Sequence, residues 1–343
     1  MLRIQSVDCF RFLAIAAVIA IHTVPFGYGK SAGHELDLVL VVNQSARFAV
    51  PFFFVISGYF WAAKIKFSAD IVALSLKSAH RVGIIFIFWS LIYLAIGAAR
   101  SFVSGGRTEL LNNAVATITN VADEPITWLL QGGKPHLWFL TALLISMLIS
   151  GILLAKCRLR LLIAMAVFLY VIGLLGGEYR DSPIGLNFDF DFRNGPFFGL
   201  ICFVSGYLLH QARPKRSWMG YGALLMLVAL ITHFGELLLL NAVFGTTMWQ
   251  DYVGSTLFLG LGAAMMALSN HPALHLPGIS RVGPFILGTY AVHYFFVDVF
   301  RSWHRFSAIP WLDEILYICL VLILSILSVL AMSRYTPMRK LVT

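Results

Sequence analysis

The sequence predicts an all-α integral membrane protein with about ten transmembrane helices and both termini in the cytoplasm. The prediction rests on the apolar composition, the spacing of apolar runs and the distribution of Lys and Arg. Of the 343 residues, 59% are hydrophobic and only 12% are charged, whereas soluble domains carry about 25% charged residues. This composition excludes an ordinary soluble domain.

Ten apolar runs are separated by charged or Pro/Gly-rich breaks. Each has roughly the 20 residues that a helix needs to cross the hydrocarbon core of a bilayer. The predicted helices cover residues 7–27, 46–63, 81–100, 136–155, 160–177, 194–212, 218–239, 251–269, 283–301 and 312–333. Because these helices take up the chain, we expect a single transmembrane domain over residues 1–343, without an appended soluble domain.

The positive residues set the predicted orientation, because Lys and Arg are retained in cytoplasmic loops. With the N-terminus inside, 15 of the 25 Lys and Arg residues fall on the cytoplasmic side. They are Arg3, Lys64, Lys66, Lys77, Arg81, Lys156, Arg158, Arg160, Arg213, Lys215, Arg216, Arg281, Arg334, Arg339 and Lys340. The formal charge of +9 is therefore attributed to topology, and no nucleic-acid partner is expected.

Two longer segments are predicted on the outer face. Residues 101–135 include an amphipathic stretch around 109–130 that is expected on the outer membrane surface, and residues 178–193 form an acidic loop. The four cysteines have no paired spacing and lie in or at the ends of apolar runs. They are expected to be small buried hydrophobic residues rather than disulfides or metal ligands.

Arg11 and His22 are the strongest candidates for a site. Both lie in the first apolar run, where a cation and an imidazole are costly to bury. The eleven steps between them leave the two side chains within about 20° of one helix face and about 16 Å apart along the axis. Each alone has a structural explanation: Arg11 as an anchor paired with Asp8 at i, i+3, and His22 as an interfacial residue. Their alignment favours a site inside the membrane.

The second apolar run begins near Arg47, which is either a cap at the interface or part of the site. It contains Pro-Phe-Phe at residues 51–53 and Ser-Gly-Tyr at 57–59. A related string recurs with Pro-Phe-Phe at 196–198 and Ser-Gly-Tyr at 205–207. The small Ser-Gly pairs favour close helix packing, and the recurrence suggests an old duplication.

Two further runs carry histidines that are candidate site residues. His136 and Trp138 open the fourth run at the predicted outer boundary, where the aromatic belt alone accounts for the indole. Tyr290 and His293 share one face of the ninth run at i, i+3 near mid-membrane. A mid-membrane histidine is a candidate functional residue, with a structural hydrogen bond to a neighbouring helix as the alternative.

Taken in order, four motifs resemble acyltransferase family 3. They are Arg11-x10-His22, the aromatic segment from Arg47 to Tyr59, His136-Leu-Trp-Phe and Gly288-Thr-Tyr with His293. The resemblance spans nearly the whole chain and is strongest for stand-alone bacterial members of the type that O-acetylates enterobacterial common antigen. It implies a multi-pass protein of the bacterial inner membrane that contacts membrane lipids.

The resemblance also implies a reaction. Acyl-coenzyme A, most simply acetyl-coenzyme A, would donate its acyl group from the cytoplasm to a hydroxyl of a cell-surface glycan such as exopolysaccharide or lipopolysaccharide, or of its lipid-linked precursor. His22 is expected to act as general base or to carry the acyl group transiently, and Arg11 to position the donor. Arg47, His136, Trp138, Tyr290 and His293 are expected to hold donor or acceptor, and no metal is expected.

The competing interpretation is a transporter or flippase for a sugar-lipid or small solute. Ten helices, a weak repeat and intramembrane charges are also typical of carriers. The candidate residues are arranged by depth from the coenzyme side to the acceptor side, and no pair of interrupted helices occurs at matching positions of two halves. The sequence therefore favours the acyltransferase. It does not identify the acceptor glycan or the oligomeric state.

Overall fold

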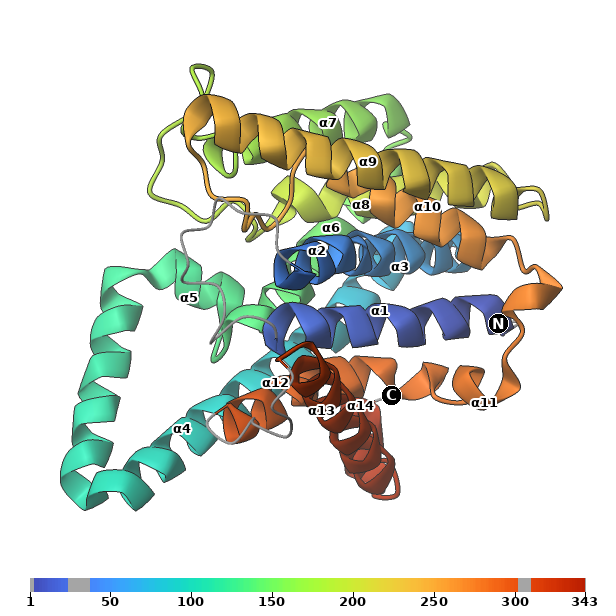
Figure 1. Cartoon of the computed structure of the whole chain (residues 1–343). Coiled ribbons are helices and arrows are strands. Elements are labelled where there is room, and N and C mark those ends of the chain that lie inside the picture. Colours follow the sequence, from blue (N-terminus) through green and yellow to red (C-terminus); the bar gives the residue numbers. More distant parts are fainter. Residues whose placement is uncertain (1–2, 24–37, 302–309, 343) are drawn as a thin grey trace. The chain divides into compact units, whose positions relative to one another are not determined.

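The computed structural model describes residues 3–23, 38–301 and 310–342, and every regular element among them is a helix (Figure 1). Eight helical spans in this part of the chain are long and apolar enough to cross a membrane. Two shorter apolar helices, α8 and α10, occupy the positions of the other two predicted helices. The all-α membrane class is thus confirmed, and the ten predicted helices become eight long and two short ones among the described residues.

The helices have the following bounds. They are α1 (Gln5–Thr23), α2 (Leu38–Ser45), η1 (Ala46–Phe48), α3 (Ala49–Ile65), α4 (Ile71–Asp123), α5 (Pro125–Gln131), η2 (Pro135–Leu137), α6 (Trp138–Ala155), α7 (Leu159–Gly176), α8 (Pro196–Gln211), α9 (Trp218–Phe244), α10 (Thr256–Leu268), η3 (Pro272–Leu274), α11 (Pro277–Ser280), η4 (Gly283–Phe285), α12 (Ile286–Phe300), α13 (Pro310–Met332) and α14 (Thr336–Val342). Residues 24–27, predicted to end the first helix, lie outside the described residues.

The chain divides into two compact units. Unit 1 contains Met1–Phe67, Leu174–Asn187 and Ile201–Thr343, and unit 2 contains Ser68–Gly173 and Phe188–Leu200. The five candidate residues Arg11, His22, Arg47, Tyr290 and His293 belong to unit 1, whereas His136 and Trp138 belong to unit 2.

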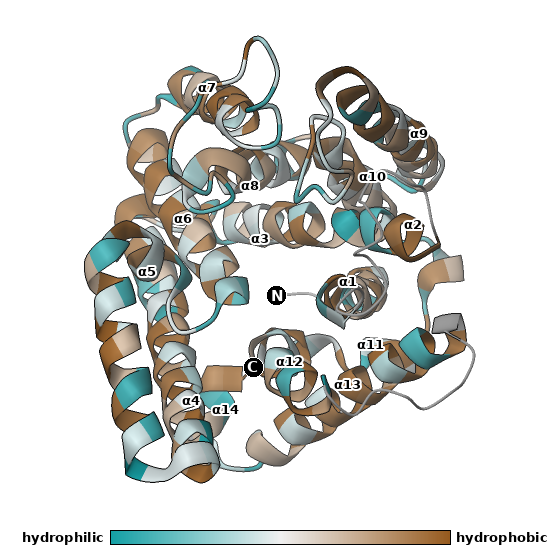
Figure 2. Cartoon of the chain, turned by 60° about the vertical axis from the view of Figure 1, so that its left-hand side comes forward, coloured by the Kyte–Doolittle hydropathy of each residue, from teal (hydrophilic) through white to brown (hydrophobic). Residues whose placement is uncertain are grey.

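Helix α1 lies inside unit 1, between α2 and α3 on one side and α12 on the other (Figure 2). Eleven of its 19 residues are buried, which leaves only a narrow exposed stripe. A side chain at Gly283 would overlap the Asp8 carboxylate, and further along the helix His22 contacts His293. Helices α1 and α12 therefore run in the same direction and place their polar residues side by side.

The repeated Ser-Gly pairs mark a close crossing of α3 and α8. A Cβ on Gly58 would overlap the carbonyl of Phe203, and a Cβ on Gly206 would overlap the carbonyl of Val55. Each glycine thus lies against the carbonyl of the residue that stands three positions before the other glycine. The sequence repeat corresponds to a reciprocal contact in which only a hydrogen fits.

Unit 2 is built on α4, which is 53 residues long and packs along α6. The helix begins ten residues before the predicted start, because the Asp70 side chain caps it by accepting a hydrogen bond from the N–H of Ala73 at 2.9 Å. The predicted outer stretch continues α4 to Asp123, with a kink at Gly105 and Gly106, where Gly106 has a φ of 63°. A short helix, α5, then leads back to the start of α6.

Helix α10 is shorter than predicted because its N-terminus is capped from another helix. The Glu236 carboxylate of α9 accepts hydrogen bonds from the N–H groups of Gly254 at 2.9 Å and Ser255 at 3.0 Å. Residues 251–255 therefore form a turn instead of the first helical turn. At the C-terminal end of α9, Gly245 stops the helix in the left-handed conformation with a φ of 68°.

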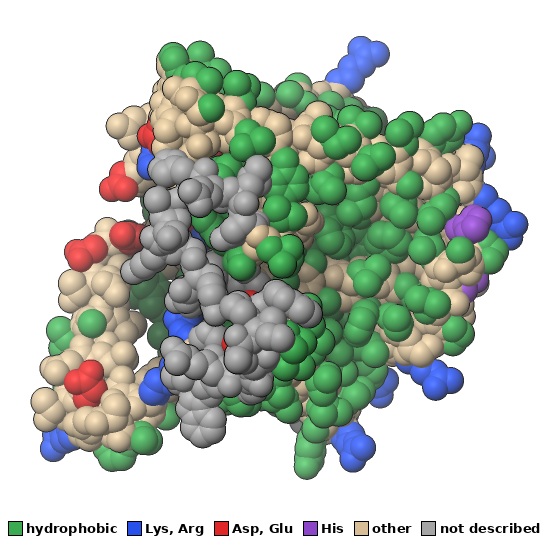
Figure 3. All heavy atoms as spheres, in the orientation of Figure 1, with side chains coloured by type: hydrophobic (Ala, Val, Ile, Leu, Met, Phe, Trp, Pro, Cys, Tyr) green, Lys and Arg blue, Asp and Glu red, His purple; other side chains and the backbone are tan. Residues whose placement is uncertain are grey.

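The exposed surface of the long helices is apolar, as expected for contact with lipid (Figure 3). On α9 the exposed large side chains include Leu224, Leu227, Ile231, Leu238 and Leu239. In Figure 3, most Lys and Arg side chains lie around the edge of the view, away from the apolar surface in its middle. The cytoplasmic location of the two termini stays a prediction.

The α3–α8 crossing makes a stability prediction. We expect Gly206→Ala to lower the free energy of unfolding by about 1–3 kcal/mol, because the added methyl forces two backbones apart. Gly97→Ala in α4 is the matched control, since nothing lies within 4 Å of its Cβ position and alanine favours a helix by about 1 kcal/mol. Thermal unfolding of the purified proteins in detergent measures both, and an unchanged Gly206→Ala protein would contradict the close contact.

Candidate active site

The N-terminal half of α1 carries a buried carboxylate between two guanidinium groups. Asp8 is 4% exposed. Its Oδ2 accepts a hydrogen bond from Arg3 Nε at 2.6 Å, and its Oδ1 accepts one from Arg11 Nη1 at 3.1 Å. Arg3 also donates to the carbonyl of Ser280. The carboxylate therefore holds the two arginines at fixed positions, and Arg3 connects the start of α1 to α11.

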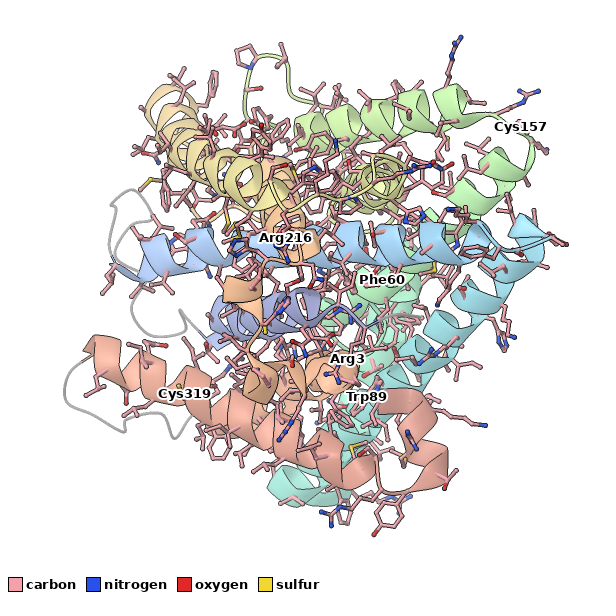
Figure 4. All side chains as sticks on the ribbon, turned by 90° about the vertical axis from the view of Figure 1, so that its right-hand side faces the viewer. Arg3, Phe60, Trp89, Cys157, Arg216 and Cys319 are labelled. Atoms are coloured by element: carbon pink, nitrogen blue, oxygen red, sulfur yellow. The ribbon has the colours of Figure 1, made fainter. Side chains whose placement is uncertain are left out.

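Arg11 is oriented by a second contact. Its guanidinium carbon lies 5.1 Å from the centre of the Phe60 ring of α3, within cation–π distance. Arg3 and Phe60 are labelled in Figure 4. The predicted i, i+3 pair with Asp8 is present, yet 30% of the Arg11 side chain stays exposed. Arg11 can thus combine the structural role of an anchor with a ligand-binding role. The ion pair with Asp8 orients its guanidinium, and the exposed part of the side chain is still accessible.

His22, near the other end of α1, meets two aromatic residues of α12. Its ring centre lies 5.3 Å from that of His293 at an interplanar angle of 33°, and 5.3 Å from that of Tyr294 at 67°. His22 is half-buried, whereas His293 is fully buried. Two imidazoles thus lie side by side between α1 and α12, with one of them partly accessible.

The tautomer of His293 follows from its backbone contact. His293 Nδ1 lies 2.5 Å from the carbonyl oxygen of Tyr290. Because a carbonyl only accepts hydrogen bonds, Nδ1 must carry the proton, and Nε2 of the neutral ring is then an acceptor. The Tyr290 ring centre lies 5.9 Å from that of His293, as the i, i+3 spacing predicts. This hydrogen bond of His293 is made within α12, whereas the structural alternative considered from the sequence was a hydrogen bond to a neighbouring helix.

Arg47 lies inside a helical span rather than at its start, because helical structure already begins at Leu38. Its Nη1 donates to Asp251 Oδ1 at 2.7 Å, and its Nη2 donates to Asn43 Oδ1 at 3.1 Å. The N–H of Asp251 in turn donates to Glu178 at 3.0 Å. Arg47 therefore connects α2 to the turn before α10, and only 13% of its side chain is exposed.

In unit 2, His136 and Trp138 occupy different environments. His136 is 2% exposed and its ring meets the Tyr93 ring of α4 edge-on, with centroids 5.3 Å apart. The guanidinium of Arg193 lies 5.8 Å from the centre of the Trp138 ring and is paired with Asp191 at 2.9 Å. The Trp138 indole thus has a cation, Arg193, over its ring. This contact is additional to the position at the membrane interface that the aromatic belt predicts.

Sequence reasoning missed several partners of the candidate residues. Tyr294 adjoins His293 in the sequence, but nothing in the spacing singles it out as a neighbour of His22. Asp251 lies 204 residues from Arg47, so only the fold brings the two together. Among residues 3–23, 38–301 and 310–342, no three His, Cys, Asp or Glu side chains are arranged to hold a metal ion.

The arrangement supports chemistry at two depths along α1. A fixed, accessible cation at one end suits an anionic or strongly polar ligand, and a half-exposed imidazole beside a second imidazole at the other end suits proton transfer. The acyltransferase domain family matches residues 4–334, which is almost the whole chain. The chain belongs to acyltransferase family 3. With its apolar helices, this membership makes it a multi-pass membrane acyltransferase.

Curated relatives share part of this family 3 chain. Two amino-acid racemases of Enterococcus faecalis are 30% and 28% identical, over 52% and 69% of this chain, which is 23% and 32% of their own lengths. A serine/alanine racemase of Enterococcus gallinarum is 29% identical over 66% of this chain and 32% of its own length. The chain thus spans a quarter to a third of these relatives. No solved structure matches it.

The Asp8 contacts make a second prediction. We expect Asp8→Asn to lower the free energy of unfolding by about 2 kcal/mol, because it removes charge-assisted hydrogen bonds from two arginines. Arg3→Gln is the matched comparison and should lower it by less than about 1 kcal/mol, since half of the Arg3 side chain is exposed. Thermal unfolding checks both values, and equal effects of the two changes would show that Asp8 does not hold Arg11.

Proposed function

We propose that this protein is an O-acyltransferase that moves an acyl group, most simply acetyl, from cytoplasmic acyl-coenzyme A to a hydroxyl of a cell-surface glycan or its lipid-linked precursor. It would act in the bacterial inner membrane with both termini in the cytoplasm. The observation that carries the proposal is a single helix with an oriented arginine at one end and a half-exposed histidine at the other. The two lie about 16 Å apart along the axis.

The donor is proposed to enter at the Arg11 end. Coenzyme A carries phosphates and amides, which a guanidinium binds through several directed hydrogen bonds. Asp8 and Phe60 hold Arg11 in place, so little side-chain entropy is lost when a ligand binds. Lys64 and Lys66 end α3 near the predicted cytoplasmic surface and would attract an anionic donor from solution.

Acyl transfer is proposed to occur at the His22 end. A sugar hydroxyl is a weak nucleophile until a base removes its proton as the thioester carbonyl is attacked. His22 would take that proton as the sugar oxygen bonds to the carbonyl carbon, and would then pass it to the sulfur of coenzyme A as the thioester C–S bond breaks, so that coenzyme A leaves as a thiol and His22 is neutral again. His293 and Tyr294 support this role because their rings fix the orientation of the His22 imidazole. Transfer through an acyl-histidine would use the same geometry.

Arg47, His136, Trp138, Tyr290 and His293 are assigned secondary roles. Tyr290 and His293 support the imidazole pair from within α12. Arg47 fits a positioning role best, since its donors are directed at Asp251 and Asn43. The racemase names of the relatives describe proteins three to four times longer than the matched segment, so they do not guide the choice of reaction.

The proposal is tested by following labelled acetyl groups. Membranes containing the wild-type protein are expected to transfer label from acetyl-coenzyme A to glycan as an alkali-labile ester. His22→Ala should lower this rate by about 100-fold to 10,000-fold, the usual contribution of a general base. A folded His22→Ala protein with wild-type turnover would refute the assignment of His22. Transport of a sugar-lipid without ester formation would refute the acyltransferase proposal and favour a carrier.

The donor role of Arg11 has its own test. We expect Arg11→Lys to weaken acetyl-coenzyme A binding by about tenfold, because lysine keeps the charge but loses the planar set of donors. Equilibrium binding of labelled acetyl-coenzyme A to purified protein in detergent measures the dissociation constant. Arg339→Lys, in the C-terminal helix α14, is the matched control. Unchanged affinity in Arg11→Lys would show that Arg11 has only the structural role.

A further inference from the structure

A hollow of about 460 Å³ lies in unit 2 between the end of α4, α5 and the turn that leads to α6. Its lining residues belong to unit 2, whereas Arg11 and His22 belong to unit 1. Its lining combines one indole, two carboxylates, amide groups and a lysine. The residues are Asn120, Asp123, Glu124, Thr127, Trp128, Gln131, Gly132, Gly133, Lys134 and Pro135.

The backbone around this hollow is anchored at several points. The N–H of Trp128 donates to the carbonyl of Glu124 at 3.0 Å, and the N–H of Gly132 donates to the carbonyl of Trp128 at 2.8 Å. Gly132, with a φ of 63°, and Gly133 pack so closely on Ser90 of α4 that neither has room for a Cβ. The lining residues are therefore presented on a defined surface rather than on a loose loop.

The hollow is anchored on its α5 side as well. The Thr141 hydroxyl of α6 donates to the carbonyl of Leu130 at 2.5 Å. The amide of Gln131 lies 3.3 Å from Asn194 Oδ1 and 3.4 Å from Asp191 Oδ2. The short helix that carries Trp128 is thus bound to two other segments of the same unit.

The side chains have the chemistry of a carbohydrate site. Trp128 is half-buried and lines the hollow. A pyranose ring has an apolar C–H face that can pack on an indole and hydroxyls at its rim. A carboxylate only accepts hydrogen bonds and has two oxygens, so Asp123 and Glu124 can each bind neighbouring hydroxyls. Both carboxylates are exposed.

The same residues disfavour the anionic donor. Asp123 and Glu124 place two negative charges at the hollow against the single positive charge of Lys134. The phosphates of coenzyme A would be repelled by this excess, whereas a neutral saccharide would not. The predicted topology places residues 101–135 on the outer face, where the acceptor is expected. The lining also ends at Pro135, directly before His136 in the chain.

We propose that this hollow binds one saccharide unit of the acceptor glycan, with Trp128 as the stacking platform and Asp123 and Glu124 as hydroxyl acceptors. The inference rests on the proposed function, because it takes the acceptor to be a glycan. It assigns no part of the chemical step to these residues. Their effect is to raise the local concentration of the acceptor and to select for vicinal hydroxyls.

The test measures acceptor dependence separately from donor dependence. Purified full-length protein is given labelled acetyl-coenzyme A and the surface glycan fraction of the source organism, deacylated with mild alkali. We expect Trp128→Ala to raise the half-saturating glycan concentration about tenfold, with little change in the maximal rate or in the half-saturating donor concentration. The combined change Asp123→Asn and Glu124→Gln should have a similar effect, and Trp128→Phe should restore most of the affinity.

The control variant is Leu129→Ala, which removes an exposed side chain from the same short helix outside the hollow and should leave the glycan dependence unchanged. Wild-type glycan dependence in Trp128→Ala, with transfer intact in the wild-type protein, would overturn the saccharide site alone. Equal losses in Trp128→Ala and Leu129→Ala would also overturn it, because the effect would then be on α5 as a whole. Absence of glycan acylation by the wild-type protein would refute the proposed function instead.

Discussion

The carboxylate of Asp8, enclosed between Arg3 and Arg11, is the contact on which the arrangement of the site depends. An unpaired arginine inside the first helix would turn toward water or draw water to itself, because a charge in hydrocarbon is costly. Pairing with a buried carboxylate keeps the guanidinium on the inward face of α1 and beside Phe60. Because His22, near the other end of α1, contacts His293 of α12, both candidate residues of this helix are held by neighbouring groups.

Small residues provide the second constraint, because they decide how near the helices come. The absence of a side chain at Gly283 leaves room for Asp8, and the Gly58 and Gly206 positions bring α3 and α8 into backbone contact. In a bilayer, apolar side chains gain little from leaving lipid, so close packing and buried polar contacts carry more of the specificity. The imidazole pair of His22 and His293 depends on the spacing that such contacts set.

Much of the architecture could be predicted from the sequence, because a run of about 20 apolar residues is a strong signal in a membrane protein. The pairing of Arg11 with Asp8 followed from helical periodicity, and so did the contact of Tyr290 with His293. The ends of helices were less predictable. Helix α4 starts early because Asp70 caps it, and α10 starts late because Glu236, a residue of a different helix, binds its first N–H groups. Long-range partners such as Asp251 for Arg47 depend on tertiary structure and leave no periodic pattern.

The length of α4 has a consequence for the kind of polymer that can be modified. The part of α4 before its kink, residues 71–104, extends about 50 Å, whereas the hydrocarbon core is about 30 Å thick. The segment after the bend at Gly106 therefore continues beyond the hydrocarbon core, on the predicted outer surface, and forms with α5 a platform that leads the chain back to α6. The hollow of this platform, lined by the end of α4 and by α5, is open rather than enclosed. On the function proposed above, such a platform admits an internal unit of a long polysaccharide as readily as a chain end, so that modification would not have to wait for, or precede, polymerisation.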